Sequence, residues 1–454
     1  MLVLAILFTM ASFPATAATK NPKRVKIFTT GDSLTAGVWY PNAYRYFIYE
    51  NLIKDGGVFE FIGPKTGGDF RVNEMYRKHG GVGGAIIGCA EDYKWTGSMW
   101  TTSSWNVTTE NGIYIRSSGN KNSLHYRLFA GSDGSNDYTK TEYGNYVKEA
   151  DIVIMYIGIN DYYDTHANGI SADVEHVIER YCTLIDRVYE INPDVSLYVC
   201  ALNELDYIRG YNLKPGDSGY QNSVFKFNEL LMGDVVDSYK AKGYKIAGID
   251  LNQPEYKLVI GVDNPEDDAH PNESGNRKIG TCMYKAIRDE VLELNKQESD
   301  VEYNPVRVTG ITLSKTSANL TIGKKLKLAQ NSYMPVVIPT NAEIITTLYS
   351  SSNESVATVN KDGEVIAVSE GTATIYATAL DSLRPGATKI TATCEVTVTL
   401  HPVETPPSPS QPEPTPEQPS VQVKRPSRPF NSSKNTSSVH MLHIWQSTPT
   451  MQIK

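Results

Sequence analysis

The chain has 454 residues, of which 40% are hydrophobic and 10% aromatic, and its formal net charge is −8. A chain of this length is longer than a domain with a single hydrophobic core usually is, so we expect two or three domains. The negative charge and the lack of a basic face exclude a nucleic-acid-binding protein, because neutralising phosphates needs clustered Lys and Arg.

The cysteines are odd in number and widely scattered. No C-x-x-C pair or metal-ligand spacing occurs among them, so we expect neither a disulfide framework nor a metal site. We interpret them as buried free thiols: Cys89, Cys182, Cys200, Cys282 and Cys394.

The first residues have the pattern of an export signal. An apolar stretch begins at Leu2 and is followed by Ala15-Thr16-Ala17, a small-x-small cleavage pattern. This predicts a signal peptide over residues 1–18. Signal peptides usually begin with positively charged residues, and here the amino terminus is the only positive charge before the apolar stretch. Ser12 and Pro14 make the stretch a poor membrane span. We therefore expect a secreted, extracellular protein.

The first strand ends at a candidate nucleophile. Residues 25–29 combine β-branched and aromatic side chains and predict a short, mostly buried strand. Gly31 ends it, and Asp32 and Ser33 favour turns and helix N-caps. Open α/β sheets place their ligand crevices at such strand ends. Taken alone, Ser33 is either a nucleophile or an ordinary helix cap.

Strands and helices then alternate. A helix at 42–55 and a strand at 59–62 precede residues 64–150, whose weak periodicity indicates loops and insertions rather than regular sheet. Beyond residue 151 we expect strands at 152–157, 195–200 and 244–251, and helices at 171–191, 220–242 and 272–294. This alternation predicts parallel β-α units in a three-layer α/β/α sandwich.

The pattern changes near Pro305. Residues 306–400 form short alternating stretches without helical periodicity, which predicts a small all-β sandwich. Residues 401–454 begin with a Pro-rich linker and continue as a polar tail that we expect to be disordered. Because the change marks a domain boundary, we expect a chain that ends near Asp300 to fold and to keep its activity.

Two further loops carry candidate catalytic groups. Gly158-Ile159-Asn160-Asp161 closes the most apolar strand, where the Asn160 amide can donate to an oxyanion. Asp267-Asp268-Ala269-His270 precedes the last helix, and a carboxylate three residues before a histidine can fix its tautomer. Each loop alone is also compatible with an ordinary surface turn.

A glycine-rich segment, His79-Gly80-Gly81-Val82-Gly83-Gly84-Ala85, lies between the first strand and these loops. Packed glycines let a backbone approach a ligand closely and present its N–H groups. A flexible loop has the same composition, and the residues alone do not decide between the two.

Together these stretches resemble the SGNH hydrolases, also called the GDSL family of esterases. Gly31-Asp32-Ser33-Leu34 is similar to the nucleophile block, Gly158-Ile159-Asn160-Asp161 to the G-x-N-D block, and Asp267 to His270 to the D-x-x-H block. The resemblance covers roughly residues 22–297 and predicts a hydrolase domain at 22–300. It implies a flavodoxin-like α/β/α sandwich with a parallel sheet.

The resemblance also implies the roles of the site residues. Ser33 is the nucleophile, His270 the base and Asp267 the group that orients it. The oxyanion hole is formed by the Ser33 N–H, the Asn160 amide and the N–H of Gly84. Gly84 is aligned by similarity to carbohydrate-esterase members, with Gly81 or Gly83 as alternatives. No metal or cofactor is implied.

Residues 306–400 resemble a bacterial Ig-like domain of group 2. The segments that carry the likeness are 310–314, 350–359, 362–363 and 371–375. Nothing in them resembles a catalytic motif. A spacer or a cell-surface attachment is therefore expected, with polysaccharide contact as the alternative.

Aromatic residues suggest the substrate class. Trp39 and Tyr40 follow the nucleophile loop, and Trp95 and Trp100 belong to an aromatic insertion. Their flat rings suit stacking on sugars, although they could equally pack the insertion itself. We expect hydrolysis of O-acetyl groups on a plant polysaccharide, xylan first, or of small esters. The alternatives are a lipase or thioesterase and a non-catalytic adhesion protein.

Overall fold

The computed structural model describes residues 21–37, 43–69, 71–89, 93–98, 100–102, 123–161, 174–205, 218–264, 270–329 and 336–400. Residues Met1–Val403 form one compact unit and Glu404–Lys454 a second, and all described residues belong to the first. The expected signal peptide at 1–18 and the tail at 401–454 lie outside the described residues.

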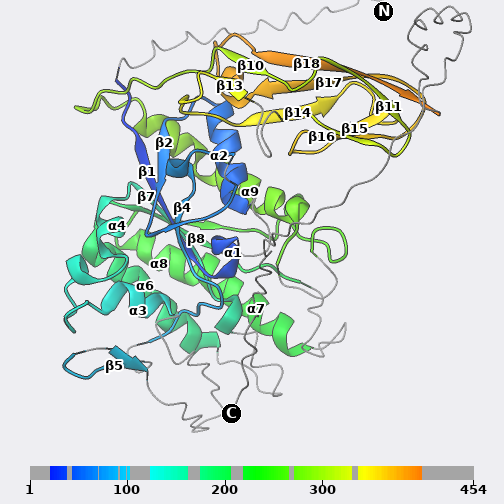
Figure 1. The fold of residues 1–454 in the computed structure, drawn as a ribbon. Coiled ribbons are helices and arrows are strands. Elements are labelled where there is room, and N and C mark those ends of the chain that lie inside the picture. The colour runs from blue at the N-terminus through cyan, green and yellow to red at the C-terminus, as the bar shows by residue number, and fades with distance from the viewer. Residues whose placement is uncertain are drawn as a thin grey trace, which may run out of the picture. The chain divides into compact units, whose positions relative to one another are not determined.

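A mostly parallel sheet forms the centre of the first domain (Figure 1). Its path is β3-β4-β1-β7-β8-β9, with β2 also paired to β1. Only the β3–β4 ladder is antiparallel among the described strands of this sheet. The strands are β1 Val25–Gly31, β2 Phe59–Ile62, β3 Lys65–Thr66, β4 Lys78–Gly81, β7 Ile152–Tyr156, β8 Ser196–Cys200 and β9 Ile246–Ile249.

The strand order confirms the flavodoxin-like prediction. Apart from β3 and β4, the strands lie in the order β2-β1-β7-β8-β9, which is the 2-1-3-4-5 order of that fold. Its topological switch point is between β1 and β7. Ligands bind outside the carboxyl ends of the strands at such a point. Ser33 and Asn160 follow these two strands.

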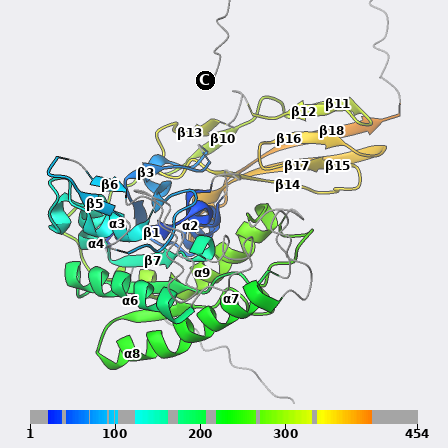
Figure 2. The ribbon, with the colours of Figure 1, turned by 90° about the horizontal axis from the view of Figure 1, so that it is seen from below.

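Helices cover both faces of the sheet (Figures 1 and 2). On one face α2 (Tyr44–Lys54) packs against α9 (Glu273–Leu294). A Cβ on Gly280 of α9 would lie 2.3 Å from the Tyr44 carbonyl oxygen, so glycine permits this close approach. On the other face lie α4 (Gly144–Glu149), α6 (Val174–Ile191), α7 (Ser218–Leu230) and α8 (Val236–Ala241).

The interval 64–150 contains more regular structure than predicted. It holds β4, helix α3 (Leu124–Phe129), α4 and a hairpin of β5 (Tyr93–Trp95) with β6 (Trp100–Thr102). Strand β4 was missed because half of its residues are glycines, which favour turns. A Cβ on Gly80 would lie 2.7 Å from the Phe28 ring, so the buried ring requires glycine there.

The helix predicted at 220–242 is also more complex. Between α7 and α8 the chain makes a π-helical turn, Leu231–Val235. Single-turn π segments are rare within α-helices, so periodicity alone predicts one continuous helix here.

Residues 306–400 form the predicted all-β domain. Its sheets have the orders β11-β18-β17-β14, β12-β16-β15 and β10-β13. In β17 the side chains of Ala373, Ile375 and Ala377 are buried, which confirms the predicted alternation. The strands are β10 Gly310–Thr312, β11 Ser317–Thr321, β12 Lys325–Lys327, β13 Val336–Ile338, β14 Thr347–Ser351, β15 Ala357–Val359, β16 Glu364–Ala367, β17 Gly371–Ala379 and β18 Thr391–Thr399.

The β domain shares a core with the α/β domain. Ile344 and Leu380 are both 0% exposed and belong to the same buried cluster as the side chains around the parallel sheet. Tyr49 of α2 and Thr346 join their hydroxyl groups at 2.9 Å. Glu343 pairs with Arg24 at 3.0 Å. These contacts make the β domain part of the structural support of the α/β domain.

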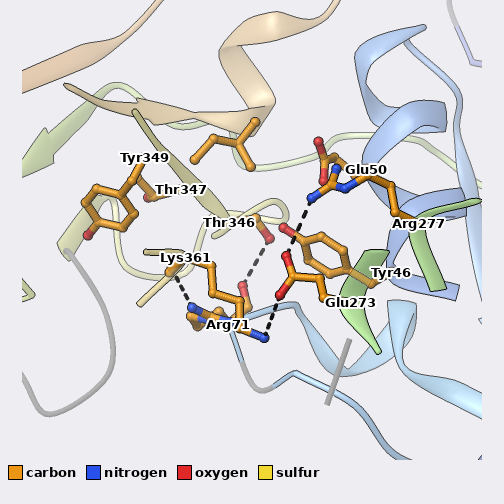
Figure 3. Close-up of a pocket in the computed structure, with 10 residues that line it drawn as sticks. Tyr46, Glu50, Arg71, Glu273, Arg277, Thr346, Thr347, Tyr349 and Lys361 are labelled. Atoms are coloured by element: carbon orange, nitrogen blue, oxygen red, sulfur yellow. Dashed lines mark hydrogen bonds and ion pairs between the residues drawn. The ribbon is translucent and has the colours of Figure 1, made fainter. Parts of the chain in front are cut away.

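A cavity of about 300 Å³ lies where the two domains meet (Figure 3). Glu273, in the first turn of α9, pairs with Arg277 at 3.5 Å and with Lys361 of the β domain at 3.4 Å. Arg71 pairs with Asp362 at 2.5 Å. Because Glu273 lies three residues after His270, the β domain contacts the helix that follows the candidate base.

The cysteines and helices of the described residues add two observations. The predicted burial holds for Cys200, Cys282 and Cys394, whereas Cys89 and Cys182 are only partly buried. No helix in the described part of the chain combines the length and apolar character that a membrane crossing requires.

Candidate active site

Ser33 begins a short helix at the carboxyl end of β1. The Asp32 carboxylate caps this helix, α1 (Ser33–Ala36), by accepting a hydrogen bond from the Leu34 N–H at 2.9 Å. Gly31 has a φ of +157°, and a Cβ there would lie 2.0 Å from the Tyr156 carbonyl oxygen. Glycine at this position therefore lets the chain turn sharply and present Ser33 at the sheet edge.

His270 meets Ser33 across this edge. The His270 Nε2 atom and the Ser33 Oγ atom are 2.7 Å apart, a hydrogen-bond distance, although 237 residues separate them. His270 lies just before α9, whose first turn is capped by Asn272 accepting from the Gly275 N–H. The structure thus brings the predicted nucleophile and base together.

Asp263 anchors the chain before His270. Its carboxylate is fully buried and accepts hydrogen bonds from Lys278 at 2.5 Å, from Ser274 at 2.7 Å and from the Val259 N–H at 2.9 Å. Burial opposes ionisation, but the bonds from Lys278 and Ser274 lower the pKa of Asp263 below its ordinary value. Asp267 and Asp268 lie outside the described residues, so the orienting role of Asp267 stays a prediction.

Asn160 and the glycine-rich segment also lie together. The Asn160 Nδ2 donates to the Ala85 carbonyl oxygen at 2.8 Å, and the Ile87 N–H donates to Asp161 Oδ2 at 3.1 Å. These two bonds hold the loop after β7 against the chain that follows Gly84. Gly84 has a φ of +70°, which disfavours any residue with a side chain.

The structure disfavours one alternative to Gly84. The Gly81 N–H donates to His79 Nδ1 at 3.0 Å, so it is committed within the protein. A Cβ on Gly81 would lie 2.3 Å from the Ala36 backbone nitrogen, so this glycine permits close packing of β4 on α1. Gly84 as an oxyanion donor stays a prediction.

Burial sets the charge states around the nucleophile. Asp32 is 1% exposed, and burial together with the negative charge of Asp161 raises its pKa to about 7. Burial, then the positive charges of Arg45 and Lys65, lower the pKa of His79 to about 2. His79 is therefore neutral, and because Nδ1 accepts a hydrogen bond, Nε2 carries its proton.

The Asp32 pKa predicts a pH-dependent stability. The pKa of Asp32 is about 7 in the folded protein and about 3.8 in the unfolded chain, so protonated Asp32 adds to the free energy of unfolding. This stabilisation is complete below about pH 4 and is lost as the pH rises through 7. Asp32→Asn keeps the capping oxygen and removes this charge. We expect the variant to gain about 2 kcal/mol of unfolding free energy over the wild type between pH 5 and pH 8.

Urea unfolding at both pH values measures this gain. Asp289→Asn, at an exposed carboxylate, is the control and should show no such change. An equal difference between Asp32→Asn and the wild type at both pH values would contradict the prediction.

The structure leaves the proposed sugar-contacting residues untested. Trp39 and Tyr40 lie outside the described residues. Trp95 and Trp100 are paired across the β5–β6 hairpin, where only the backbone is described. Their role in substrate binding stays a prediction.

Several supporting groups were not identified from the sequence. The Ala85 carbonyl fixes Asn160, and the Tyr143 hydroxyl donates to the Gly80 carbonyl. The Thr35 and Tyr44 hydroxyls lie 3.0 Å apart and join α1 to α2. Asp161, which accepts from the Ile87 N–H, is the one supporting residue that the sequence motif indicates, since it lies beside Asn160. The other supporting residues are ordinary in their local sequence, so no motif indicates them.

Solved structures of low similarity match part of the chain. A family 3 carbohydrate esterase from Clostridium thermocellum is 20% identical, with a TM-score of 0.38, and the match covers 60% of this chain and 100% of that one. A family 3 carbohydrate esterase from Talaromyces cellulolyticus is 14% identical, with a TM-score of 0.39, covering 59% and 99%. No curated protein matches the chain significantly.

Two family models match the sequence. The bacterial Ig-like domain (group 2) matches residues 307–390, within the β domain. The GDSL-like lipase/acylhydrolase matches residues 27–283, which include Ser33, Asn160 and His270. Since this second match spans more than half of the 454 residues, the chain belongs to the GDSL-like lipase/acylhydrolase family and is a carboxylic ester hydrolase.

Proposed function

We propose that this protein is a secreted serine esterase that removes O-acetyl groups from a plant polysaccharide such as xylan. The observation that carries the esterase chemistry is the 2.7 Å contact between Ser33 Oγ and His270 Nε2 at the carboxyl edge of the sheet. The family match supports ester hydrolysis. The aromatic residues after Ser33 and in the 93–105 insertion support a sugar leaving group.

The proposed mechanism is an acyl-enzyme route. Ser33 Oγ attacks the ester carbonyl carbon while His270 Nε2 accepts the hydroxyl proton, with Asp267 orienting the ring. The Ser33 and Gly84 N–H groups and the second N–H of Asn160 Nδ2 would stabilise the oxyanion. His270 then protonates the departing alcohol. Water, activated by the same imidazole, releases the acid and restores Ser33.

An acetyl group fits the residue types around Ser33. The loops that meet there are rich in glycine, asparagine and aspartate, with no long aliphatic run. Each additional acyl methylene gains about 0.8 kcal/mol only where an apolar surface buries it. Longer acyl chains should therefore gain little.

A series of esters from acetyl to octanoyl, measured beside acetylated xylan, tests this proposal. We expect the highest kcat/KM for acetyl and release of acetate from xylan. A maximum at octanoyl without acetate release would support the lipase or thioesterase alternative. Absence of hydrolysis for every ester would support a non-catalytic adhesion protein.

We further propose an extracellular location, supported by the signal-peptide pattern at residues 1–18. The Ig-like domain would then serve as a spacer or would contact a cell surface or polysaccharide. This role is compatible with its contacts to α2 and α9, which use only part of the domain.

A further inference from the structure

His79 is a buried histidine in β4, the strand that leads into the glycine-rich segment. It is only 4% exposed, which leaves it no surface for contact with a substrate. The imidazole packs against Gly67, where a Cβ would lie 2.7 Å from His79 Nε2. The Gly67 N–H donates to the Arg77 carbonyl oxygen at 3.1 Å and fixes this wall. The ring of His79 is therefore held in one place beside the end of the strand.

Strand β4 loses one of its two neighbours before it ends. It pairs with β1 as far as Gly81, whereas its last pair with β3 is at His79. The Gly81 N–H lies beyond the β3 ladder, and a buried N–H without an acceptor costs about 1–3 kcal/mol. His79 Nδ1 accepts a hydrogen bond from this N–H at 3.0 Å, and the bond is buried. The side chain thus supplies the acceptor that a neighbouring strand would otherwise provide.

The chain that follows β4, residues 82–85, is fixed at points that border the site; we call it the oxyanion loop. The Val82 N–H donates to the Gly31 carbonyl oxygen at 3.0 Å, and the Ala85 N–H donates to the Val82 carbonyl oxygen at 3.1 Å. The Ala85 carbonyl oxygen accepts from Asn160 at 2.8 Å. Gly84, the predicted oxyanion donor, has no side chain to hold it. The direction of its N–H therefore depends on the anchors at both ends of the loop.

We propose that His79 is a positioning residue that orients the oxyanion loop toward the tetrahedral intermediate. This inference rests on the proposed function and adds a residue to it. His79 acts as a neutral acceptor, because burial, followed by the charges of Arg45 and Lys65, lowers its pKa to about 2. Losing the acceptor would release Gly81 and let the loop shift. A displacement of about 1 Å in an active site can lower the rate about 100-fold.

Two variants separate the acceptor from the bulk of the ring. His79→Asn can place its Oδ1 near the position of Nδ1, whereas His79→Leu fills a similar volume without an acceptor. On a small acetyl ester we expect His79→Leu to lower kcat by roughly 10- to 100-fold with little change in KM. His79→Asn should retain most of the wild-type kcat. Val291→Ala, at a fully buried position near the other end of α9, controls for lost stability and should keep the wild-type kcat.

A thionoester, in which sulfur replaces the carbonyl oxygen, tests the link to the oxyanion. Sulfur accepts hydrogen bonds weakly, so the wild type should hydrolyse the oxygen ester much faster than the thionoester. His79→Leu should narrow this ratio by about 10-fold, because it weakens a bond that only the oxygen ester makes well. An unchanged ratio with a lower kcat for both esters would indicate a general structural role and overturn the proposal. Wild-type kcat in His79→Leu would overturn it as well.

Amide hydrogen exchange gives a readout that needs no hydrolysis. Mass spectrometry of peptides that cover residues 80–85 should show faster exchange in His79→Leu and wild-type exchange in His79→Asn, since only leucine removes the acceptor of the Gly81 N–H. Equal exchange in the three proteins would overturn the proposal. If the wild type hydrolysed no ester, the proposed function would fail and the catalytic role of His79 with it, whereas the exchange difference would still establish the anchor.

Discussion

Replacing Ser33 with Ala is expected to lower kcat on a small acetyl ester by about 10⁶-fold, and His270→Ala should have nearly the same effect. The two side chains act as one unit through their 2.7 Å contact, so losing either removes the covalent route. The double variant should therefore lose little more than either single variant. Initial rates with an acetyl ester measure this, and circular dichroism checks that the variants fold.

The controls separate catalysis from structure. Ser132→Ala changes an exposed serine outside the segments that form the site, and it should keep wild-type activity. Asp267→Asn should cost less than Ser33→Ala, because it affects only the tautomer and orientation of His270. If Asp268→Asn were more damaging than Asp267→Asn, the orienting carboxylate would be Asp268. Wild-type activity of Ser33→Ala would refute the nucleophile assignment.

Removing the β domain is expected to destabilise the α/β domain strongly. The sequence change at Pro305 by itself predicts that a chain ending near Asp300 folds and keeps its activity. The contacts now predict a large loss, because Ile344 and Leu380 are fully buried in the shared core and Thr346 bonds to Tyr49. Losing two such side chains and their polar neighbours costs about 5 kcal/mol, which lowers the Tm by roughly 10–20 °C.

Thermal unfolding of the truncated and full chains measures this loss. Within the full chain, Leu380→Ala should lower the temperature at which esterase activity is lost, since a buried Leu→Ala change costs about 2–5 kcal/mol. Leu400→Ala is the matched control because Leu400 is 59% exposed. Equal melting temperatures for the truncated and full chains would show that the shared core does not support the α/β domain.

Much of the local structure followed from short-range patterns. The apolar run at 152–156 is a fully buried central strand, and the alternation at 371–379 has the predicted inward face. Asn272 caps α9 at the predicted start. Such features depend on neighbours a few residues away, so periodicity and capping chemistry are enough to predict them. Motif order likewise predicted Ser33, Asn160 and His270 as site residues, and the structure brings Ser33 Oγ and His270 Nε2 to 2.7 Å.

Other features were decided only by the tertiary structure. Strand β4 is hidden by its glycines, which are required by Phe28 and α1 rather than by any local preference. The shared core depends on Ile344 and Leu380, which look like ordinary sandwich residues in their own segments.

The pKa values of individual polar groups are also decided only by the tertiary structure. The raised pKa of Asp32 results first from its burial and in part from the nearby Asp161, which is far away in the chain. The sequence by itself determined which residue types could do chemistry and which local elements would carry them. Burial, charge and the distance between groups depend on residues that meet only in the folded chain, so the tertiary structure decided those.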